Sequence, residues 1–126
     1  MPKPIIALDF DGVVHSYTTE FTFPEVIPDP PVPGAIEFIK EMRDNYEIVI
    51  FSSRCQSFRC EREIKKWLIN NGLEREYVDE LDVTLEKPPA DIYIDDRAYC
   101  FKGEFPSKEF IKNFKPWNQG DRTKKQ

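Results

Sequence analysis

The feature that most constrains this chain is an apolar run near its start that ends in two carboxylates and a glycine. Residues 5–8 show no polar alternation, which is typical of a central strand in a parallel sheet that is covered on both faces. Asp9 and Asp11 follow two residues apart, so in extended backbone their side chains leave on the same side. Gly12 permits the sharp turn that must come next. The run therefore predicts a buried strand that brings acids to a surface.

Two carboxylates this close repel each other, and both stay ionised only where a cation or hydrogen-bond donors compensate their charge. Mg²⁺ prefers oxygen ligands and binds through one or two carboxylates together with a substrate phosphate. An aspartate-rich turn that merely ends a strand is the simpler alternative. The Asp-x-Asp-Gly motif alone does not decide between a metal site and a turn.

Helical and strand patterns alternate along the rest of the chain. We expect a helix over 33–43, a strand over 46–51, a helix over 57–70, a weaker strand over 77–85, a strand over 90–94 and a helix from about Ser107. Residues 13–32, called the flap below, contain four prolines after an alternating run, which predicts a short β-hairpin or flap and then an extended linker. The alternation predicts an α/β fold, a Rossmann-like doubly wound parallel sheet with helices on both faces.

The strand over 90–94 is also followed by two acids, Asp95 and Asp96. Ligands of parallel α/β sheets bind beyond the carboxyl ends of the strands. Because both acidic pairs follow apolar strands, we expect them at the same edge of the sheet. This repetition of the first motif is the strongest sequence argument for a site there.

The composition indicates one soluble domain. The chain has 126 residues, 40% hydrophobic and 33% charged, and we expect a single domain over 1–114 with a polar, basic and mobile tail over 115–126. It has neither an apolar run of membrane-spanning length nor a basic-then-apolar leader, so we expect a cytoplasmic protein without a membrane partner. The net charge of -5 argues against a protein built mainly to bind nucleic acid. Three cysteines without paired spacing indicate neither a disulfide framework nor a zinc site.

Four motifs follow one another in a recognisable order. They are Asp9-x-Asp11-Gly12, then Ser52 after an apolar strand, then Lys87, then Asp95-Asp96 after another apolar strand. In this order they resemble the haloacid dehalogenase (HAD) superfamily of phosphohydrolases, over residues 5–101. The resemblance implies a Mg²⁺-dependent phosphatase that hydrolyses a phosphate monoester through an aspartyl-phosphate intermediate.

The resemblance also implies a role for each motif. Asp9 matches the nucleophile, and Asp11 matches the general acid and base. Ser52 matches the hydroxyl that binds a phosphoryl oxygen, with Ser53 as the less favoured candidate, and Lys87 matches the cation that offsets negative charge. Taken singly, Ser52 could instead cap a helix and Lys87 could be an ordinary solvated lysine.

The implied metal ligands are the acids of the first and last motifs. Mg²⁺ would be held by Asp9, by the backbone carbonyl of Asp11 and by Asp96, while Asp95 would be a second ligand or an orienting partner. A turn that begins at Asp95-Asp96 is the alternative without a metal. Gly12, Ser53, Arg54, His15 and Tyr17 are our candidates for substrate binding, although a surface salt bridge is an equally good interpretation of Arg54.

The spacing between motifs leaves no room for an inserted cap domain, so the chain is similar to capless members of the superfamily. An open site would suit a small phosphorylated metabolite, which the acidic balance of the chain favours. The alternatives are a nucleic-acid 3'-phosphatase and a non-catalytic module that binds Mg²⁺ and phosphate. A homo-oligomer whose second subunit closes the open site is a further expectation.

Overall fold

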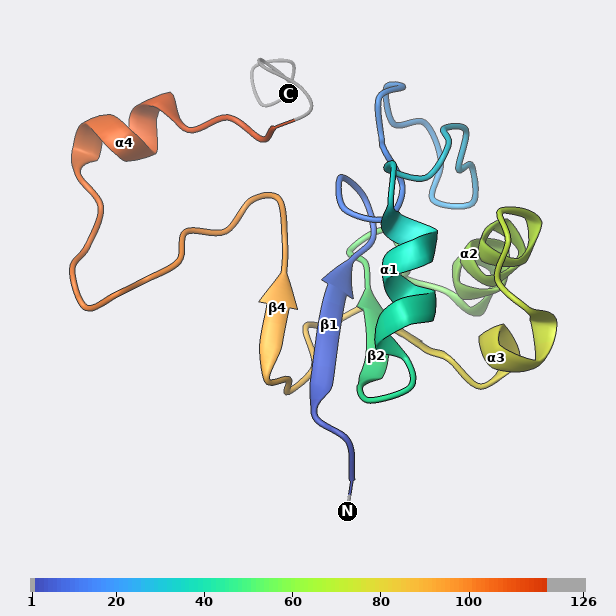
Figure 1. Cartoon of the computed structure of the whole chain (residues 1–126). Helices are drawn as coiled ribbons and strands as arrows, with labels where there is room; N and C mark the ends of the chain where they lie inside the picture. Colours follow the sequence, from blue (N-terminus) through green and yellow to red (C-terminus); the bar gives the residue numbers. More distant parts are fainter. Residues whose placement is uncertain (1, 118–126) are drawn as a thin grey trace.

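The computed structural model describes residues 2–117 of this chain as a parallel α/β fold (Figure 1). Its strands form one four-stranded sheet in the order β3-β2-β1-β4, and every neighbouring pair is parallel. Residues 118–126, the greater part of the predicted tail, lie outside the described residues. The elements in chain order are β1 (Ile5–Asp9), α1 (Ala35–Met42), β2 (Glu47–Phe51), α2 (Phe58–Asn70), α3 (Arg75–Asp79), β3 (Asp82–Thr84), β4 (Ile92–Ile94) and α4 (Lys108–Asn113).

The strand that opens the chain lies inside the sheet, between β2 and β4. Its three central residues, Ile6, Ala7 and Leu8, are all buried, which confirms the prediction of a strand covered on both faces. Asp9 is the last residue of this strand and lies opposite Phe51, the last residue of β2. The carboxyl ends of these two strands therefore finish level with each other.

The main core lies between one face of the sheet and the first three helices. Alternate residues of the strands, such as Ile6 and Ile50, join a single buried cluster with residues of α1, α2 and α3. The helical residues of that cluster include Ile36, Ile39, Ile64, Trp67, Leu68 and Val78. The helix expected over 33–43 is thus confirmed, and it packs on the sheet through Ile36 and Ile39.

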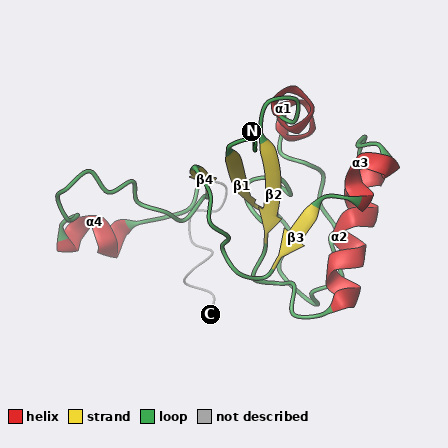
Figure 2. Ribbon diagram, turned by 90° about the horizontal axis from the view of Figure 1, so that it is seen from below, coloured by secondary structure: helices red, strands yellow, loops and turns green. Residues whose placement is uncertain are grey.

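The expectation of helices on both faces is wrong for the described part of the chain. Figure 2 shows α1, α2 and α3 on one side of the sheet, while α4 stands apart beyond β4. No helix lies between β3 and β4, because the connection holds Pro88 and Pro89, which do not propagate a helix. Instead, Lys87 from this connection lies over the rings of Phe51 and Tyr93 on the second face. The sheet is consistent with a Rossmann-like fold but is small and incomplete for a doubly wound one.

The weaker strand expected over 77–85 covers parts of two elements in the structure. Its first residues belong to α3, and only Asp82–Thr84 form β3. The buried residues Val78 and Leu81 are three apart, a helical spacing, whereas tyrosine and valine favour strands by composition. The strand-favouring composition therefore led to the prediction of a strand where the spacing of the buried residues is helical.

The flap contains no helix and no hairpin; one isolated bridge joins His15 to Asp11 in the loop after β1, and another joins His15 to Pro31 within the flap. The Asp29 carboxylate accepts hydrogen bonds from the backbone amides of Thr18 and Thr19 and from the Thr19 hydroxyl. Because these donors are bonded to Asp29, they are not available for pairing between the strands of a hairpin. The segment therefore folds around Asp29. Among residues 2–117, no helix has the length and apolarity needed to cross a bilayer.

Candidate functional site

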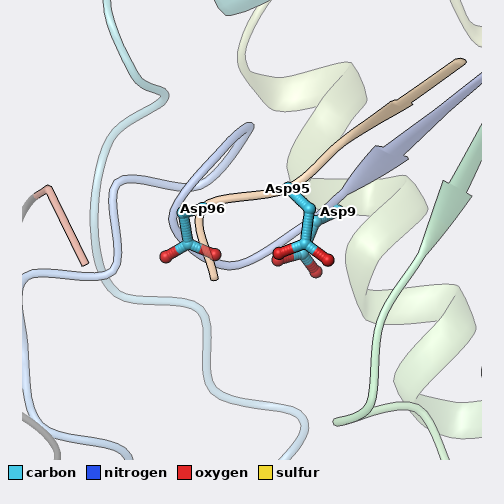
Figure 3. Close-up of side chains that lie close together, drawn as sticks. All are labelled: Asp9, Asp95 and Asp96. Atoms are coloured by element: carbon cyan, nitrogen blue, oxygen red, sulfur yellow. The ribbon is translucent and has the colours of Figure 1, made fainter. Parts of the chain in front are cut away.

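Three carboxyl groups meet at the carboxyl edge of the sheet (Figure 3). Asp9 ends β1, and Asp95 and Asp96 follow β4, the strand that lies beside it. One oxygen of each residue lies within 4.8 Å of the others. The parallel order of β1 and β4 brings these acids together although they are far apart in the sequence. This juxtaposition is the one that the repeated acidic motif predicted.

The cluster strongly disfavours the ionised form of Asp9. Burial of its carboxyl, its hydrogen bond with Asp96 and the charges of Asp95, Asp96 and Asp11 raise the pKa of Asp9 to about 8. A carboxyl with this pKa holds a proton at neutral pH unless a cation replaces it. Three clustered carboxylates are a suitable donor set for a hard divalent cation such as Mg²⁺.

Gly12 lets the loop after β1 approach the cluster closely. Its φ is +89°, a left-handed conformation that glycine adopts without steric cost. A Cβ atom at this position would collide with the carboxyl group of Asp96. Glycine at position 12 is thus required both by the turn and by the space that Asp96 occupies.

The Asp11 side chain is turned away from this cluster. Its Oδ1 lies 2.8 Å from His15 Nδ1, and the Arg54 guanidinium donates to both carboxylate oxygens, with Nε and Nη2 each 2.9 Å away. Burial works to raise the pKa of Asp11, but the hydrogen bonds from His15 and Arg54 and the charge of Arg54 outweigh it, so its pKa is lowered. Asp11 is therefore held as a carboxylate in this arrangement.

Arg54 joins Asp11 to the flap. The residue is 5% exposed, and its Nη1 donates to the carbonyl oxygens of Pro24 and Val26 at 3.1 and 2.8 Å. The guanidinium also lies over the rings of Tyr17 and Phe21. Position 54 follows β2, so this one side chain fixes the flap against both the Asp11 carboxylate and the end of the second strand.

His15, which lies near the start of the flap, is completely buried. The backbone amide of Asp29 donates to His15 Nε2 at 3.1 Å, so Nε2 is the acceptor and Nδ1–H is the donor to Asp11. The imidazole packs against Phe10 and Trp67. His15 thus orients Asp11 from the interior of the protein.

The remaining predicted residues lie around the cluster at different depths. Ser52 is buried at the end of β2, where its Oγ accepts from the Arg54 amide at 3.3 Å, whereas Ser53 is exposed. The cap of α2 is Ser57, whose Oγ accepts from Cys60 N, so Ser52 does not cap that helix. Lys87 reaches the cluster through Asp95, with 3.5 Å between its Nζ and Asp95 Oδ2.

Sequence reasoning missed the contribution of Trp117. Its indole Nε1–H donates to the Gly12 carbonyl at 2.7 Å, so a residue of the supposed tail lies against the loop that follows Asp11. Tryptophan in an otherwise polar, basic stretch was the available signal. Asp29, which organises the flap, was missed because the alternating run that contains Thr18 and Thr19 predicts pairing between strands and not hydrogen bonds to an aspartate.

The cysteines do not extend the site. Cys55 and Cys60 are buried with 2.7 Å between their sulfur atoms, and burial raises the pKa of both thiols. A buried thiol with a raised pKa is a poor nucleophile. Cys100 is exposed and free.

Neither comparison with known proteins by sequence gives a relative: no family model matches the chain, and no curated protein matches it significantly.

Proposed function

We propose that this protein is a Mg²⁺-dependent phosphatase that hydrolyses phosphate monoesters through an aspartyl-phosphate on Asp9. The observation that carries the proposal is the meeting of Asp9, Asp95 and Asp96 at the carboxyl edge of β1 and β4. The order of the four sequence motifs, which resembles the HAD superfamily, supports it independently of this geometry. The raised pKa of Asp9 fits a site that needs a bound cation.

The donor set fits Mg²⁺ by its chemistry. Asp9, Asp95 and Asp96 offer carboxylate oxygens within 4.8 Å of one another, and Gly12 leaves the Asp96 carboxyl room beside the loop. The backbone carbonyl of Asp11 is the further ligand that the resemblance implies. A bound Mg²⁺ would neutralise the cluster and offset the charge that develops on the phosphoryl oxygens.

The reaction would proceed in two displacements. An Asp9 carboxylate oxygen attacks phosphorus, the ester bond breaks, and the leaving oxygen takes a proton from Asp11. Water then attacks the phosphorus of the aspartyl-phosphate and gives its proton to Asp11, while the bond between phosphorus and Asp9 oxygen breaks. Inorganic phosphate leaves and both aspartates are regenerated.

The surroundings of Asp11 suit the second displacement better than the first. With Arg54 and His15 hydrogen-bonded to it, Asp11 is a carboxylate and can accept the proton of the attacking water. To act as an acid, it must first hold a proton, which the Arg54 contact opposes. We therefore expect the Asp11 side chain to leave Arg54 when substrate binds.

Two further groups would bind the phosphoryl oxygens. Ser52 lies at the end of β2, beside the end of β1, and Lys87 pairs with Asp95 at the border of the cluster. Removal of one such positioned electrostatic group costs on the order of a hundredfold to a thousandfold in rate. We expect Ser52→Ala and Lys87→Met to fall in that range.

A small phosphate ester is the proposed substrate class. Within residues 2–117, the interval between β1 and α1 contains only the flap, and the interval between β2 and β3 contains only the helices α2 and α3 with their loops. Neither interval contains a cap domain that could cover the cluster. The chain is acidic, with a net charge of -5, which disfavours long nucleic acids. A 3'-phosphorylated nucleic-acid end is the second candidate because an uncapped site admits one.

The decisive test measures phosphate release from sugar phosphates, nucleotides and 3'-phosphorylated oligonucleotides, with Mg²⁺ and with EDTA. We expect release with Mg²⁺ from wild type and only background release from Asp9→Asn. Asp91→Asn is a matched control because it removes an aspartate at the opposite end of β4, where Asp91 accepts from the Ile5 amide. Equal release by wild type and Asp9→Asn would contradict the proposal.

Beryllium fluoride separates the phosphatase from a metal nuclease or phosphodiesterase built on the same acids. A phosphatase with an aspartyl-phosphate intermediate should bind this phosphoryl mimic at Asp9 in the presence of Mg²⁺. A nuclease should cleave diesters and show no Asp9-dependent binding of it. Folded protein that binds Mg²⁺ but releases phosphate from no ester would indicate a non-catalytic binding module.

A further inference from the structure

Two thiols that the proposed reaction does not use lie side by side next to the flap. The Sγ atoms of Cys55 and Cys60 are 2.7 Å apart, and both cysteines are free. A disulfide bond is about 2.05 Å long, so the two sulfur atoms need to approach by only about 0.7 Å to form one. Cys55 lies in the loop after β2 and Cys60 in the first turn of α2. The fold therefore brings together two thiols whose spacing in the sequence did not indicate a disulfide.

This thiol pair belongs to the contact that fastens the flap. Cys55 directly follows Arg54 in the sequence. The Arg54 guanidinium joins the Asp11 carboxylate to the Pro24 carbonyl of the flap. The Cys60 thiol donates to the same carbonyl at 3.6 Å. A bond between the two sulfur atoms would tie the backbone beside Arg54 to the start of α2, where this contact is made.

We propose that Cys55 and Cys60 are an oxidation site, at which a peroxide produces a reversible disulfide that fastens the flap more firmly. Cys55 is 7% exposed and Cys60 is 0% exposed, so the peroxide meets Cys55 first. An S–O bond forms at Cys55, the O–O bond breaks, and water leaves. The Cys60 sulfur then attacks the Cys55 sulfur, the S–S bond forms, the S–O bond breaks, and a second water leaves. The two thiols give up two electrons and two protons, and the peroxide is reduced to two waters.

The burial of the thiol pair decides the rate of oxidation and not its product. Burial raises the pKa of both thiols, so few molecules carry the reactive thiolate and oxidation is slow. After Cys55 has been oxidised, the Cys60 sulfur is already in contact with it. Cys100 is exposed and reacts faster, but it does not belong to the pair. We therefore expect a slow oxidation with one product.

Oxidation acts on the flap in two opposite ways. It removes the proton that the Cys60 thiol donates to the Pro24 carbonyl, but a thiol is a weak donor. Arg54 continues to donate to that carbonyl at 3.1 Å. The new covalent bond restricts the loop that carries Arg54, and a covalent bond outweighs one weak hydrogen bond. The oxidised flap should therefore open less often.

The first experiment treats the full chain carrying Cys100→Ser with hydrogen peroxide and then maps the product by alkylation and mass spectrometry. We expect both remaining thiols to disappear together, the mass to fall by two hydrogen atoms, and one peptide to link positions 55 and 60. Dithiothreitol should restore both thiols. The single variants Cys55→Ser and Cys60→Ser, made in the same background, are the matched controls and should show no loss of thiol that dithiothreitol reverses.

The second experiment measures what the fold contributes. The same chain is equilibrated with mixtures of reduced and oxidised glutathione, in buffer and in urea. The folded chain already holds the two sulfur atoms in contact, whereas the unfolded chain must lose conformational freedom to do so. The equilibrium constant for disulfide formation should be at least about tenfold larger in the folded chain, which is about 30 mV in reduction potential.

Limited proteolysis measures the effect on the flap. Cleavage within residues 13–32 should be slower in the oxidised chain than in the reduced chain, and peroxide should not change it in Cys55→Ser. Circular dichroism checks that each variant is folded. None of these readouts requires hydrolysis of a phosphate ester, so this test and the test of the proposed function succeed or fail separately.

Three results would overturn the proposal. Peroxide could oxidise the two cysteines without linking them, or the equilibrium constants of the folded and unfolded chains could be equal. The flap could also be cleaved at the same rate, or faster, in the oxidised chain, which would mean that the disulfide does not fasten it.

Discussion

At the scale of single residues, Gly12 and Gly34 provide a matched pair for measuring the tightness of the candidate site. Both have φ near +90°, but a Cβ atom at Gly12 meets the Asp96 carboxyl, whereas one at Gly34 meets nothing within 4 Å. Gly34→Ala should cost about 1 to 2 kcal/mol because of its backbone conformation alone. Gly12→Ala should cost about 1 kcal/mol more because it also overpacks the loop against Asp96.

Urea unfolding of the two variants without metal checks this prediction. Equal losses of unfolding free energy would mean that Asp96 moves aside without cost. Mg²⁺ binding, followed by calorimetry, should weaken in Gly12→Ala and stay unchanged in Gly34→Ala.

Arg54 is the residue on which the arrangement of Asp11 depends. Arg54→Ala should cost about 3 kcal/mol, because it leaves a largely buried carboxylate without its bidentate partner. Arg54→Lys should restore only part of the loss, since an ammonium cannot donate to both Asp11 oxygens and to the flap carbonyls in the same fork geometry.

Arg43 provides the control for Arg54. It forms the same bidentate contact with Glu74, but at the surface, where solvent screens the pair, so Arg43→Ala should change the free energy of unfolding little. Limited proteolysis adds a second readout: the flap should become sensitive in Arg54→Ala and not in Arg43→Ala. Similar behaviour of the two variants would contradict the role given to Arg54.

The residues of the acidic cluster could be predicted from sequence, whereas the contacts that hold Asp11 could not. Asp9, Asp95 and Asp96 follow apolar strands, and the rule for parallel sheets places them together. The contact between Arg54 and Asp11 depends on the path of an irregular flap, which no periodicity describes. Sequence reasoning therefore gave Arg54 a surface or substrate role and overlooked its burial.

At the scale of elements, two helices begin with a serine cap in different surroundings. Ser57 caps α2, which buries Cys60, Ile64, Trp67 and Leu68, and Ser107 caps α4, which buries no residue. Ser57→Ala should lower the free energy of global unfolding by about 1 kcal/mol. Ser107→Ala should fray α4 with little effect on the global transition of the monomer, because the sheet does not rest on it.

Hydrogen exchange and urea unfolding at low protein concentration distinguish these effects. Amides of α4 should exchange faster in Ser107→Ala, and the midpoint of unfolding should move only in Ser57→Ala. A shift of the midpoint in both variants would mean that α4 packs on the folded body of the same chain.

Elements with a clear period were predicted well, and those without one were not. The helix starts near Ser57 and Ser107 and the strands around Ile6 and Ile50 followed directly from the pattern. The missing helix on the second face could not be foreseen from alternation alone, because alternation does not say that a proline-containing connection replaces a crossover helix. Which face a helix covers is decided by packing among distant segments.

At the scale of the whole molecule, the acidic cluster makes stability depend on pH and metal. The pKa of Asp9 is about 8 in the folded chain and 3.8 in its usual state, so between these values the folded chain binds more protons than the unfolded chain. Without metal, the contribution of Asp9 to the free energy of unfolding should therefore be fully present below pH 3.8. It should be lost as the pH rises towards 8. This contribution to the free energy of unfolding is about 1.4 kcal/mol for each unit of difference between the two pKa values.

Thermal unfolding between pH 5 and pH 8 tests this sign. With EDTA, wild type should lose stability over this range and Asp9→Asn should lose less. With Mg²⁺ the wild-type loss should shrink, because the cation replaces the proton and stabilises the folded state by mass action. The Asp11 contribution has the opposite sign, since its pKa is lowered, and it disappears only as the solution becomes strongly acidic. A wild type that gains stability towards pH 8 in EDTA would contradict the arrangement of the cluster.

The hydrogen bond between Trp117 and Gly12 spans 105 positions of the sequence. During synthesis, the strand that carries Asp9 leaves the ribosome long before the indole that contacts the next loop. A nascent chain can therefore pair β1 with β2 while the Gly12 carbonyl still faces water. The candidate site acquires this neighbour only after nearly all of the described chain has been translated, later than every strand of the sheet.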